Sequence, residues 1–170
     1  MTEPIPLSQF LARPGSAESG TSRRTARPAA RRASLPALGA LAVDSAELSA
    51  LRYRAPSGYV VRELRGPKMT TTGGVFDEFA AAFQFPYYFG ENKDAFDECL
   101  RDLDDFVGEA AGYVAVVRDS ADLLVDQPAE RDWFVEAVND CADYWSKRDI
   151  AFRVILQGEQ VFTQAVPLML

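Results

Sequence analysis

Histidine is absent from all 170 residues of this chain, and its absence removes several kinds of chemistry. No Ser-His-Asp or Cys-His arrangement is possible without it, and the commonest transition-metal ligand is missing. Cysteine occurs only twice, so we expect no disulfide framework. No apolar run approaches the length of a transmembrane helix. These absences leave a protein whose function rests on binding more readily than on covalent or metal chemistry.

Other sequence signatures of catalysis or ion binding are also lacking. Gly73-Gly74 has no Lys-Ser/Thr after it, so it is not a phosphate-binding loop. Residues 102–108 lack the alternating oxygen ligands of a calcium loop. Asp94 and Glu98 leave a two-carboxylate hydrolase open, but they project from a convex helix. We therefore expect no enzymatic activity, no metal and no cofactor.

The formal net charge of −7 conceals an asymmetry along the chain. Residues 1–57 contain eight arginines and four acidic residues, a net charge of +4. Residues 58–170 contain ten basic and twenty-one acidic residues, a net charge of −11. An acidic domain of this kind is repelled by phosphate backbones and attracted by basic proteins. We expect a cationic protein partner, with no direct binding to nucleic acid or to a membrane.

Residues 1–57 form a low-complexity extension rich in Arg, Ala and Pro. From Ala12 to Pro36 large apolar residues are nearly missing, so the segment cannot bury enough surface to offset its ordering entropy. We expect most of the extension to be disordered and residues 58–170 to form the folded domain. Arg31-Arg32 before a short apolar run leaves a twin-arginine export signal open, but Pro36 interrupts that run, and we expect a cytoplasmic protein.

The order of elements after residue 58 predicts an α/β fold. Short apolar or alternating runs indicate strands, and apolar residues at a helical period indicate the segments between them. Strands separated by helices imply right-handed crossovers, so we expect a small three-stranded parallel sheet flanked by helices. The predicted strands are 59–64, 113–118 and 151–156, and the predicted helices are 74–83, an acidic helix from about residue 93, and 129–147.

The acidic helix is the most informative segment of the chain. At 100° per residue, Phe96 and Leu100 gather on one side, while Asp94 and Glu98 lie near the centre of the other. Carboxylates three and four residues apart repel each other, so this face contributes little to stability and suits a positively charged partner. The plainer interpretation of the acidic face is a solvated surface without a binding role. Asn92 is the predicted N-cap of the helix.

Aromatic residues precede this helix and favour the binding interpretation. Tyr87, Tyr88 and Phe89 stand directly before it, and aromatic side chains beside charge are typical of contact centres. We expect at least one of the three to pack in the core.

The segment from Pro86 to Leu100 resembles the barstar family, intracellular inhibitors of the ribonuclease barnase. The shared pattern is Pro-x-Tyr-aromatic-Gly-Glu-Asn-x-Asp-Ala-hydrophobic-x-acid-Cys-Leu, without a gap. Beyond it the order of elements agrees from about Tyr59 to Gln157. The resemblance implies a barstar-like fold of three parallel strands with helices packed around them. It also implies a function, in which the acidic helix and the adjoining loop enter the active-site groove of a secreted ribonuclease.

The resemblance also implies the contact residues. Carboxylates on the helix would take the positions of RNA phosphates, and a tyrosine would stack where a base lies. A further acidic contact comes from the last long helix, where Asp143 is the assigned counterpart and Asp140 the alternative. The predicted partner-binding residues are Tyr88, Asn92, Asp94, Asp97, Glu98 and Asp143.

Three positions depart from the family pattern. Glu98 replaces an aspartate and carries its charge one methylene further out, Asp97 replaces a tryptophan, and Lys93 stands where an apolar residue is expected. These changes predict weak or no inhibition of barnase itself and a different basic toxin ribonuclease as the target. We expect the free chain to be monomeric.

Two other binding functions stay open. One is an acidic adaptor or regulator that keeps the barstar fold but no longer inhibits a nuclease. The other is a self-regulated protein whose Arg-rich segment covers the acidic helix until a partner displaces it.

Overall fold

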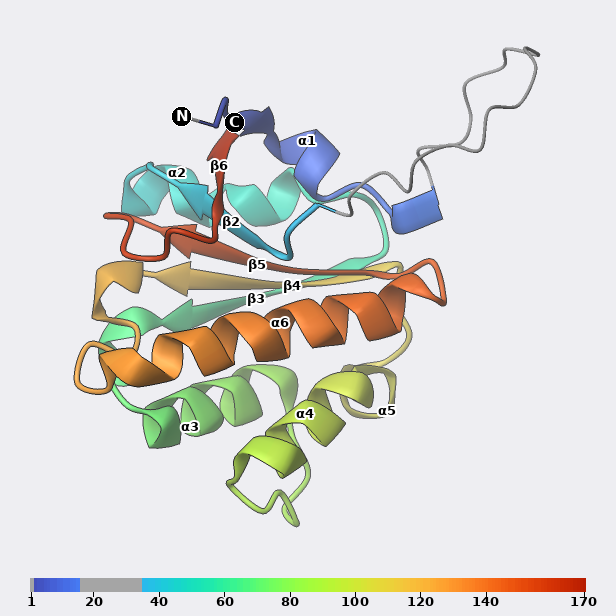
Figure 1. Cartoon of the computed structure of the whole chain (residues 1–170). Helices are drawn as coiled ribbons and strands as arrows, with labels where there is room; N and C mark the ends of the chain where they lie inside the picture. The colour runs from blue at the N-terminus through green and yellow to red at the C-terminus, as the bar shows by residue number, and fades with distance from the viewer. Residues whose placement is uncertain (1, 16–34) are drawn as a thin grey trace, which may run out of the picture.

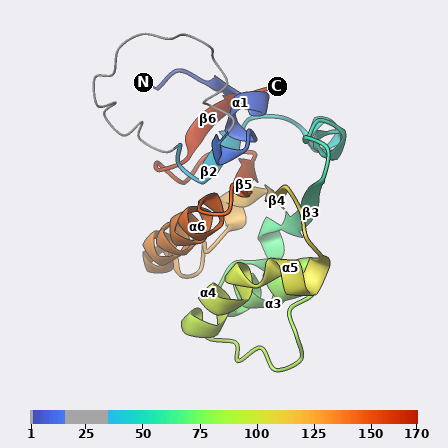
Figure 2. The same cartoon turned by 90° about the vertical axis from the view of Figure 1, so that its right-hand side faces the viewer.

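The computed structural model describes residues 2–15 and 35–170 of the chain. These residues form three layers, with a parallel β-sheet between helices on its two faces (Figure 1, Figure 2). Helices α3, α4, α5 and α6 lie on one face, and α1 and α2 lie on the other. The sheet order is β1-β6-β2-β5-β4-β3, and every pair of neighbours is parallel.

The bounds of the elements agree with the sequence patterns in the second half of the chain. The strands are β1 Ile5–Pro6, β2 Leu38–Leu41, β3 Tyr59–Arg65, β4 Gly112–Arg118, β5 Ala151–Gln157 and β6 Val166–Met169. The helices are α1 Leu7–Phe10, α2 Ser45–Ser49, α3 Thr72–Phe83, α4 Lys93–Arg101, α5 Leu103–Val107 and α6 Arg131–Ser146. All three predicted strands and all three predicted helices are therefore present.

The predicted number of strands is wrong, because the sheet has six and not three. The predicted strands β3, β4 and β5 form one half of the sheet, and β2, β6 and β1 extend the sheet beyond β5. The sequence patterns missed the added strands because these are short, with four residues in each of β2 and β6 and two in β1. The predicted small parallel sheet is the part that agrees with the family pattern.

Strand β2 pairs with β5 on one side and with β6 on the other, which explains its small residues. A Cβ atom added at Gly39 would lie 2.5 Å from Cδ1 of Leu168 and 2.9 Å from Cζ of Phe10. The absence of a side chain therefore lets β6 and α1 approach β2 closely. The apolar run considered as part of an export signal contains β2. Arg31-Arg32 lie outside the described residues, and so does most of the segment from Ala12 to Pro36 that was expected to be disordered.

Residues alternate along the strands between two apolar clusters, one on each face of the sheet. Val114, Val116 and Ile155 face the cluster that Leu7, Phe10, Leu11, Leu41, Leu48 and Leu51 complete from the first 57 residues. Ala115, Val117 and Val154 face the larger cluster under α3, α4 and α6. Because both faces of β4 are buried, its sequence is a continuous apolar run, as the pattern predicted.

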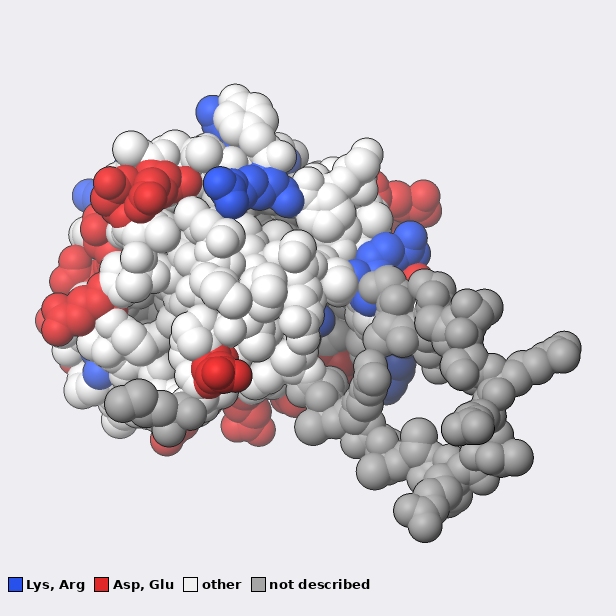
Figure 3. Space-filling view, turned by 90° about the horizontal axis from the view of Figure 1, so that it is seen from above, with Lys and Arg blue, Asp and Glu red and all other residues white. Residues whose placement is uncertain are grey.

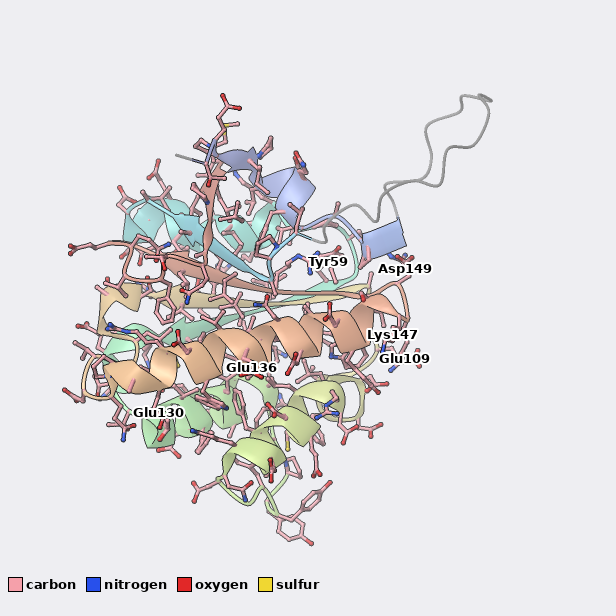
Figure 4. The ribbon with its side chains drawn as sticks, viewed as in Figure 1. Tyr59, Glu109, Glu130, Glu136, Lys147 and Asp149 are labelled. Carbon is pink, nitrogen blue, oxygen red and sulfur yellow. The ribbon has the colours of Figure 1, made fainter. Side chains whose placement is uncertain are left out.

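The segment around α1 is fixed to the sheet by a buried cation. The Arg153 guanidinium is 8% exposed, donates from Nε to the Phe10 carbonyl at 3.0 Å and lies 5.7 Å from the centre of the Phe10 ring. Burial lowers the pKa of Arg153, with the Tyr59 hydroxyl group opposing the shift. Tyr59 and Asp149 lie at the same end of the molecule (Figure 4), and Asp149 binds Arg13 at 2.9 Å.

The face on which α1 and α2 lie carries little charge in its middle. Seen from the side of α1 and α2, the middle of the surface is largely uncharged and most acidic side chains lie toward its margin (Figure 3). The acidic helix α4 lies on the other side of the sheet. In residues 2–15 and 35–170 no helix is long and apolar enough to cross a membrane.

Candidate functional site

Helix α4 begins at the predicted residue. The Asn92 carboxamide oxygen accepts a hydrogen bond from the Ala95 backbone N–H at 2.9 Å, and its Nδ2 donates to the Gly90 carbonyl at 3.2 Å. Asp94 lies in the first turn, where the helix dipole favours a negative charge. Asn92 therefore fixes the position of α4 as its N-cap, whatever contact it makes with a partner.

The two faces of α4 separate as the helical period predicted. Phe96, Cys99 and Leu100 are buried, whereas Asp94 and Glu98 are exposed one turn apart. The helix ends at Arg101 and a separate short helix, α5, follows, so the acidic segment is not continuous. At the break, burial raises the pKa of Asp102, and the charges of Asp105 and Asp104 add to the shift. Repulsion among these carboxylates at the negative end of the helix dipole is consistent with the break.

Helix α6 holds the C-terminal end of α4 in place. The Trp145 indole Nε1–H donates to the Leu100 carbonyl at 2.8 Å, and the Cys141 Sγ lies 3.5 Å from the same oxygen. This carbonyl is in the last turn of α4, where helix carbonyls lack a partner within the helix. The hydrogen bonds therefore set the spacing between α4 and α6 before any partner binds.

A hollow of about 300 Å³ opens between these two helices and brings two predicted residues together. Asp97 from α4 and Asp143 from α6 both line it, and so does Asp140, the alternative counterpart of Asp143. The remaining lining residues are Arg101, Cys141, Tyr144 and Lys147. Asp94, Glu98 and Tyr88 are not among the residues that line the hollow. The predicted residues therefore fall into two groups, with Asp97 and Asp143 at the hollow and the others outside it.

The environment of Asp97 is unfavourable to its charge. Burial raises the pKa of Asp97, Arg101 opposes the shift, and the carboxylates of Asp140, Asp94 and Glu136 add to it. Cys141 lines the same hollow, but burial raises the pKa of its thiol well above the usual value. A protonated, buried thiol is a poor nucleophile, so Cys141 offers no covalent chemistry in the hollow.

Replacement of Asp97 by asparagine is expected to stabilise the free protein at neutral pH. Because the folded state raises the pKa of Asp97, its ionisation opposes folding above the folded pKa and has no effect below the unfolded pKa. The Asp97→Asn protein should therefore have the larger free energy of unfolding at pH 7, and the difference should shrink toward zero near pH 3. Urea unfolding at both values tests this, and a difference that persists at low pH would show another cause.

The one cation in the first turn of α4 is directed away from its acidic face. The Lys93 ammonium binds a Glu130 carboxylate oxygen at 2.6 Å and lies 5.2 Å from the centre of the Trp133 ring. Figure 4 shows Glu130 at the N-terminal end of α6, facing the α3–α4 side. This ion pair leaves the carboxylates of Asp94 and Glu98 without an intervening positive charge. No sequence pattern identified it, because the two residues are 37 positions apart.

The loop before α4 divides its aromatic residues between core and solvent. Phe89 packs edge-on against Phe76 at 5.9 Å, which confirms that one of the three aromatics belongs to the core. Tyr88 is 69% exposed and Tyr87 is fully exposed. The predicted contact residue Tyr88 is therefore available to a partner.

Within the described ranges, no group of three or more His, Cys, Asp or Glu side chains is arranged to hold a metal ion.

These features agree with one known family. A family model described as barstar (barnase inhibitor) matches residues 59–157, more than half of the chain. The chain belongs to the barstar family. The matched region runs from the first residue of β3 to the last residue of β5 and includes α4 and the loop before it. No curated protein matches the chain.

The barstar match leaves out the elements that complete the sheet. Strands β1, β2 and β6 and helices α1 and α2 all lie outside residues 59–157. They cover the second face of β4 and β5 with apolar side chains. The barstar region of this chain thus carries α4 on one face of the sheet, while α1 and α2 lie on the other face and the added strands extend the sheet beyond β5.

Proposed function

We propose that this chain is an intracellular inhibitor, or immunity protein, of a basic ribonuclease toxin. The observation that carries the proposal is the exposed pair Asp94 and Glu98 on α4, next to two exposed tyrosines, in a chain of the barstar family. A ribonuclease cleft is built to bind phosphates and is lined with cationic groups. The carboxylates occupy those phosphate positions as charge-assisted hydrogen-bond acceptors, and Tyr88 stacks where a base would lie.

Binding removes an electrostatic cost of the free protein. The carboxylates of α4 repel one another in the absence of a partner, and Asp97 is held in an environment that disfavours its charge. Arginine or lysine side chains of the target neutralise this repulsion and give Asp97 a counterion. The same negative surface accelerates encounter with a basic protein, so association is fast at low ionic strength and slows as salt is added.

The target differs from barnase in the shape of its groove. Glu98 reaches further than the aspartate of the family pattern, and Asp97 adds a charge where that pattern has an aromatic ring. Asp97 lies beside Asp143 and Asp140, which makes this part of the contact more acidic. We infer a target with additional basic groups opposite the hollow, and weak or no inhibition of barnase.

Capture from native lysate tests the proposal. The immobilised full-length chain should retain a basic protein with ribonuclease activity, and the purified chain should inhibit that activity at a one-to-one ratio as a monomer. The control for the carboxylates of α4 is Glu3→Ala plus Glu159→Ala. This variant replaces two exposed carboxylates outside α4 and α6 and should behave as the wild type. Retention of a basic protein without ribonuclease activity would favour the acidic adaptor and contradict inhibition.

Self-masking of α4 by the Arg-rich segment is tested by replacing the arginines of that segment, and not by deleting it. Residues 16–34 lie outside the described part of the chain, but their neighbours on both sides are fixed to the fold, since β2 pairs within the sheet and Gly15 donates to Asp149 at 2.7 Å. Replacement of the five arginines between residues 23 and 32 by glutamine leaves β2 in place. Masking predicts faster association of that variant beyond the acceleration that its more negative net charge causes by itself, and an unchanged rate would contradict masking.

A further inference from the structure

The most exposed large hydrophobic side chain in the described residues is not among the predicted partner-binding residues. Tyr87 is 101% exposed, which is more than Tyr53 at 79% and Tyr88 at 69%. Its ring lies 5.6 Å from that of Tyr88 at 83°, edge against face. In this arrangement the rings touch each other and leave the rest of the Tyr87 surface open to solvent.

The loop that carries Tyr87 is fixed on both sides. Phe85 packs edge-on against Phe89 at 5.2 Å, and both are packed against the larger apolar cluster. The Phe89 N–H donates to the Pro86 carbonyl at 3.0 Å, which closes the turn that contains the two tyrosines. The Phe85 N–H donates to the Ala80 carbonyl at 3.0 Å and joins the loop to the end of α3. A partner that binds Tyr87 therefore pays little entropy for ordering the loop.

The charge around this loop indicates what the ring can bind. The loop leads directly into α4, which carries the exposed carboxylates of Asp94 and Glu98, and these attract basic side chains. The face of an aromatic ring attracts a cation through its quadrupole. The chain itself uses this contact elsewhere, with Arg52 at 5.0 Å from the Tyr53 ring centre and Arg148 at 4.9 Å from that of Trp145.

We propose that Tyr87 is a further specificity-determining contact, whose ring binds an arginine or lysine side chain at the rim of the partner's cleft. The proposal rests on the proposed function, because it takes the basic partner of α4 as its occupant. The two contacts divide the recognition between them. The carboxylates of α4 engage the phosphate-binding groups inside the cleft, and Tyr87 selects among basic ribonucleases by a cation outside it.

Three substitutions test the proposal with the ribonuclease activity that beads retain from one native lysate. Tyr87→Phe keeps the ring face and should retain that activity within about twofold of the wild type. Tyr87→Leu keeps much of the apolar surface but has no ring, and should retain about tenfold less, as expected for loss of a cation–π contact. Tyr53→Leu removes another exposed ring, outside the loop, and should behave as the wild type.

Each alternative outcome contradicts a different statement. Equal retention by Tyr87→Leu and the wild type overturns the Tyr87 contact while leaving the function of α4 intact. Equal losses in Tyr87→Phe and Tyr87→Leu show that the hydroxyl group makes the contact, which overturns the cation. Undiminished retention by Asp94→Ala plus Glu98→Ala contradicts the proposed function. If the wild type retains no ribonuclease, that function is contradicted too, and the Tyr87 proposal fails with it because its partner is missing. Urea unfolding of each variant confirms that the fold is unchanged.

Discussion

Deletion of residues 1–57 is expected to unfold the protein, although the family match begins only at residue 59. The deletion removes β2 from between β5 and β6, and it removes β1 from the other side of β6. It also uncovers Val114, Val116 and Ile155, which the first 57 residues keep dry. A sheet that loses two strands and the cover of one face presents an unpaired edge and an exposed apolar surface.

The size of the effect follows from the side chains that are lost. Burial of a leucine or phenylalanine stabilises a fold by about 1.5–3 kcal/mol, and six such residues of the deleted segment belong to this cluster. Their combined loss, about 9–18 kcal/mol, is as large as the net stability of an ordinary domain, about 5–15 kcal/mol. Circular dichroism of residues 58–170 should show no cooperative thermal transition.

A shorter truncation provides the control for this deletion. Residues 2–4 are exposed and precede β1, so a chain that begins at Ile5 after its initiator methionine should melt as the full chain does. A cooperative transition of residues 58–170 at the temperature of the full chain would show that the barstar region folds alone and that β2 only decorates it.

Replacement of both exposed carboxylates of α4, Asp94→Ala plus Glu98→Ala, is expected to lower the affinity for the captured ribonuclease by at least about 1,000-fold. Truncation of one partner in a desolvated charge pair costs about 2–5 kcal/mol, because the other charge is left buried and unpaired. Two such losses correspond to three or more factors of ten in the dissociation constant. Association rates measured at two salt concentrations would also show a smaller dependence on ionic strength in this variant.

The fold of the double variant should be unaffected, which separates binding from stability. Both side chains are exposed, neither forms an ion pair within 4 Å in the described part of the chain, and alanine is the residue with the best helix propensity. Asp94 contributes a small favourable interaction with the helix dipole. A dissociation constant within tenfold of the wild type, in a protein that unfolds at the same urea concentration, would place recognition elsewhere.

Local patterns predicted the elements that carry the site. The continuous apolar run of β4, the helical period of α4 and the capping asparagine are each encoded within a few residues, so the sequence sufficed for them. The exposure of Asp94 and Glu98 follows from the same helical period. The alternation of strands and helices along the chain predicted that the central strands run parallel, as β3, β4 and β5 do.

The remaining features depend on contacts between distant segments. Strand β2 has only two large residues, Leu38 and Leu41, and it is stabilised by pairing with β5 and β6 more than by its own composition. The C-terminal end of α4 is bound by Trp145 of α6, which lies 45 positions further along the chain than Leu100. The Lys93–Glu130 ion pair and the approach of Asp97 to Asp143 join α4 to the region of α6, and no short-range pattern contains them.

Carboxyl footprinting of the complex tests the central claim most directly, because it reports the solvent exposure of each acidic side chain. Free and ribonuclease-bound protein are labelled with a carbodiimide and glycine ethyl ester, and each site is quantified by mass spectrometry. We expect Asp94 and Glu98 to lose most of their labelling on binding, whereas Glu3 and Glu159, exposed outside α4 and α6, keep theirs. Equal labelling of Asp94 and Glu98 in the free and bound protein would contradict the insertion of α4 into the ribonuclease cleft.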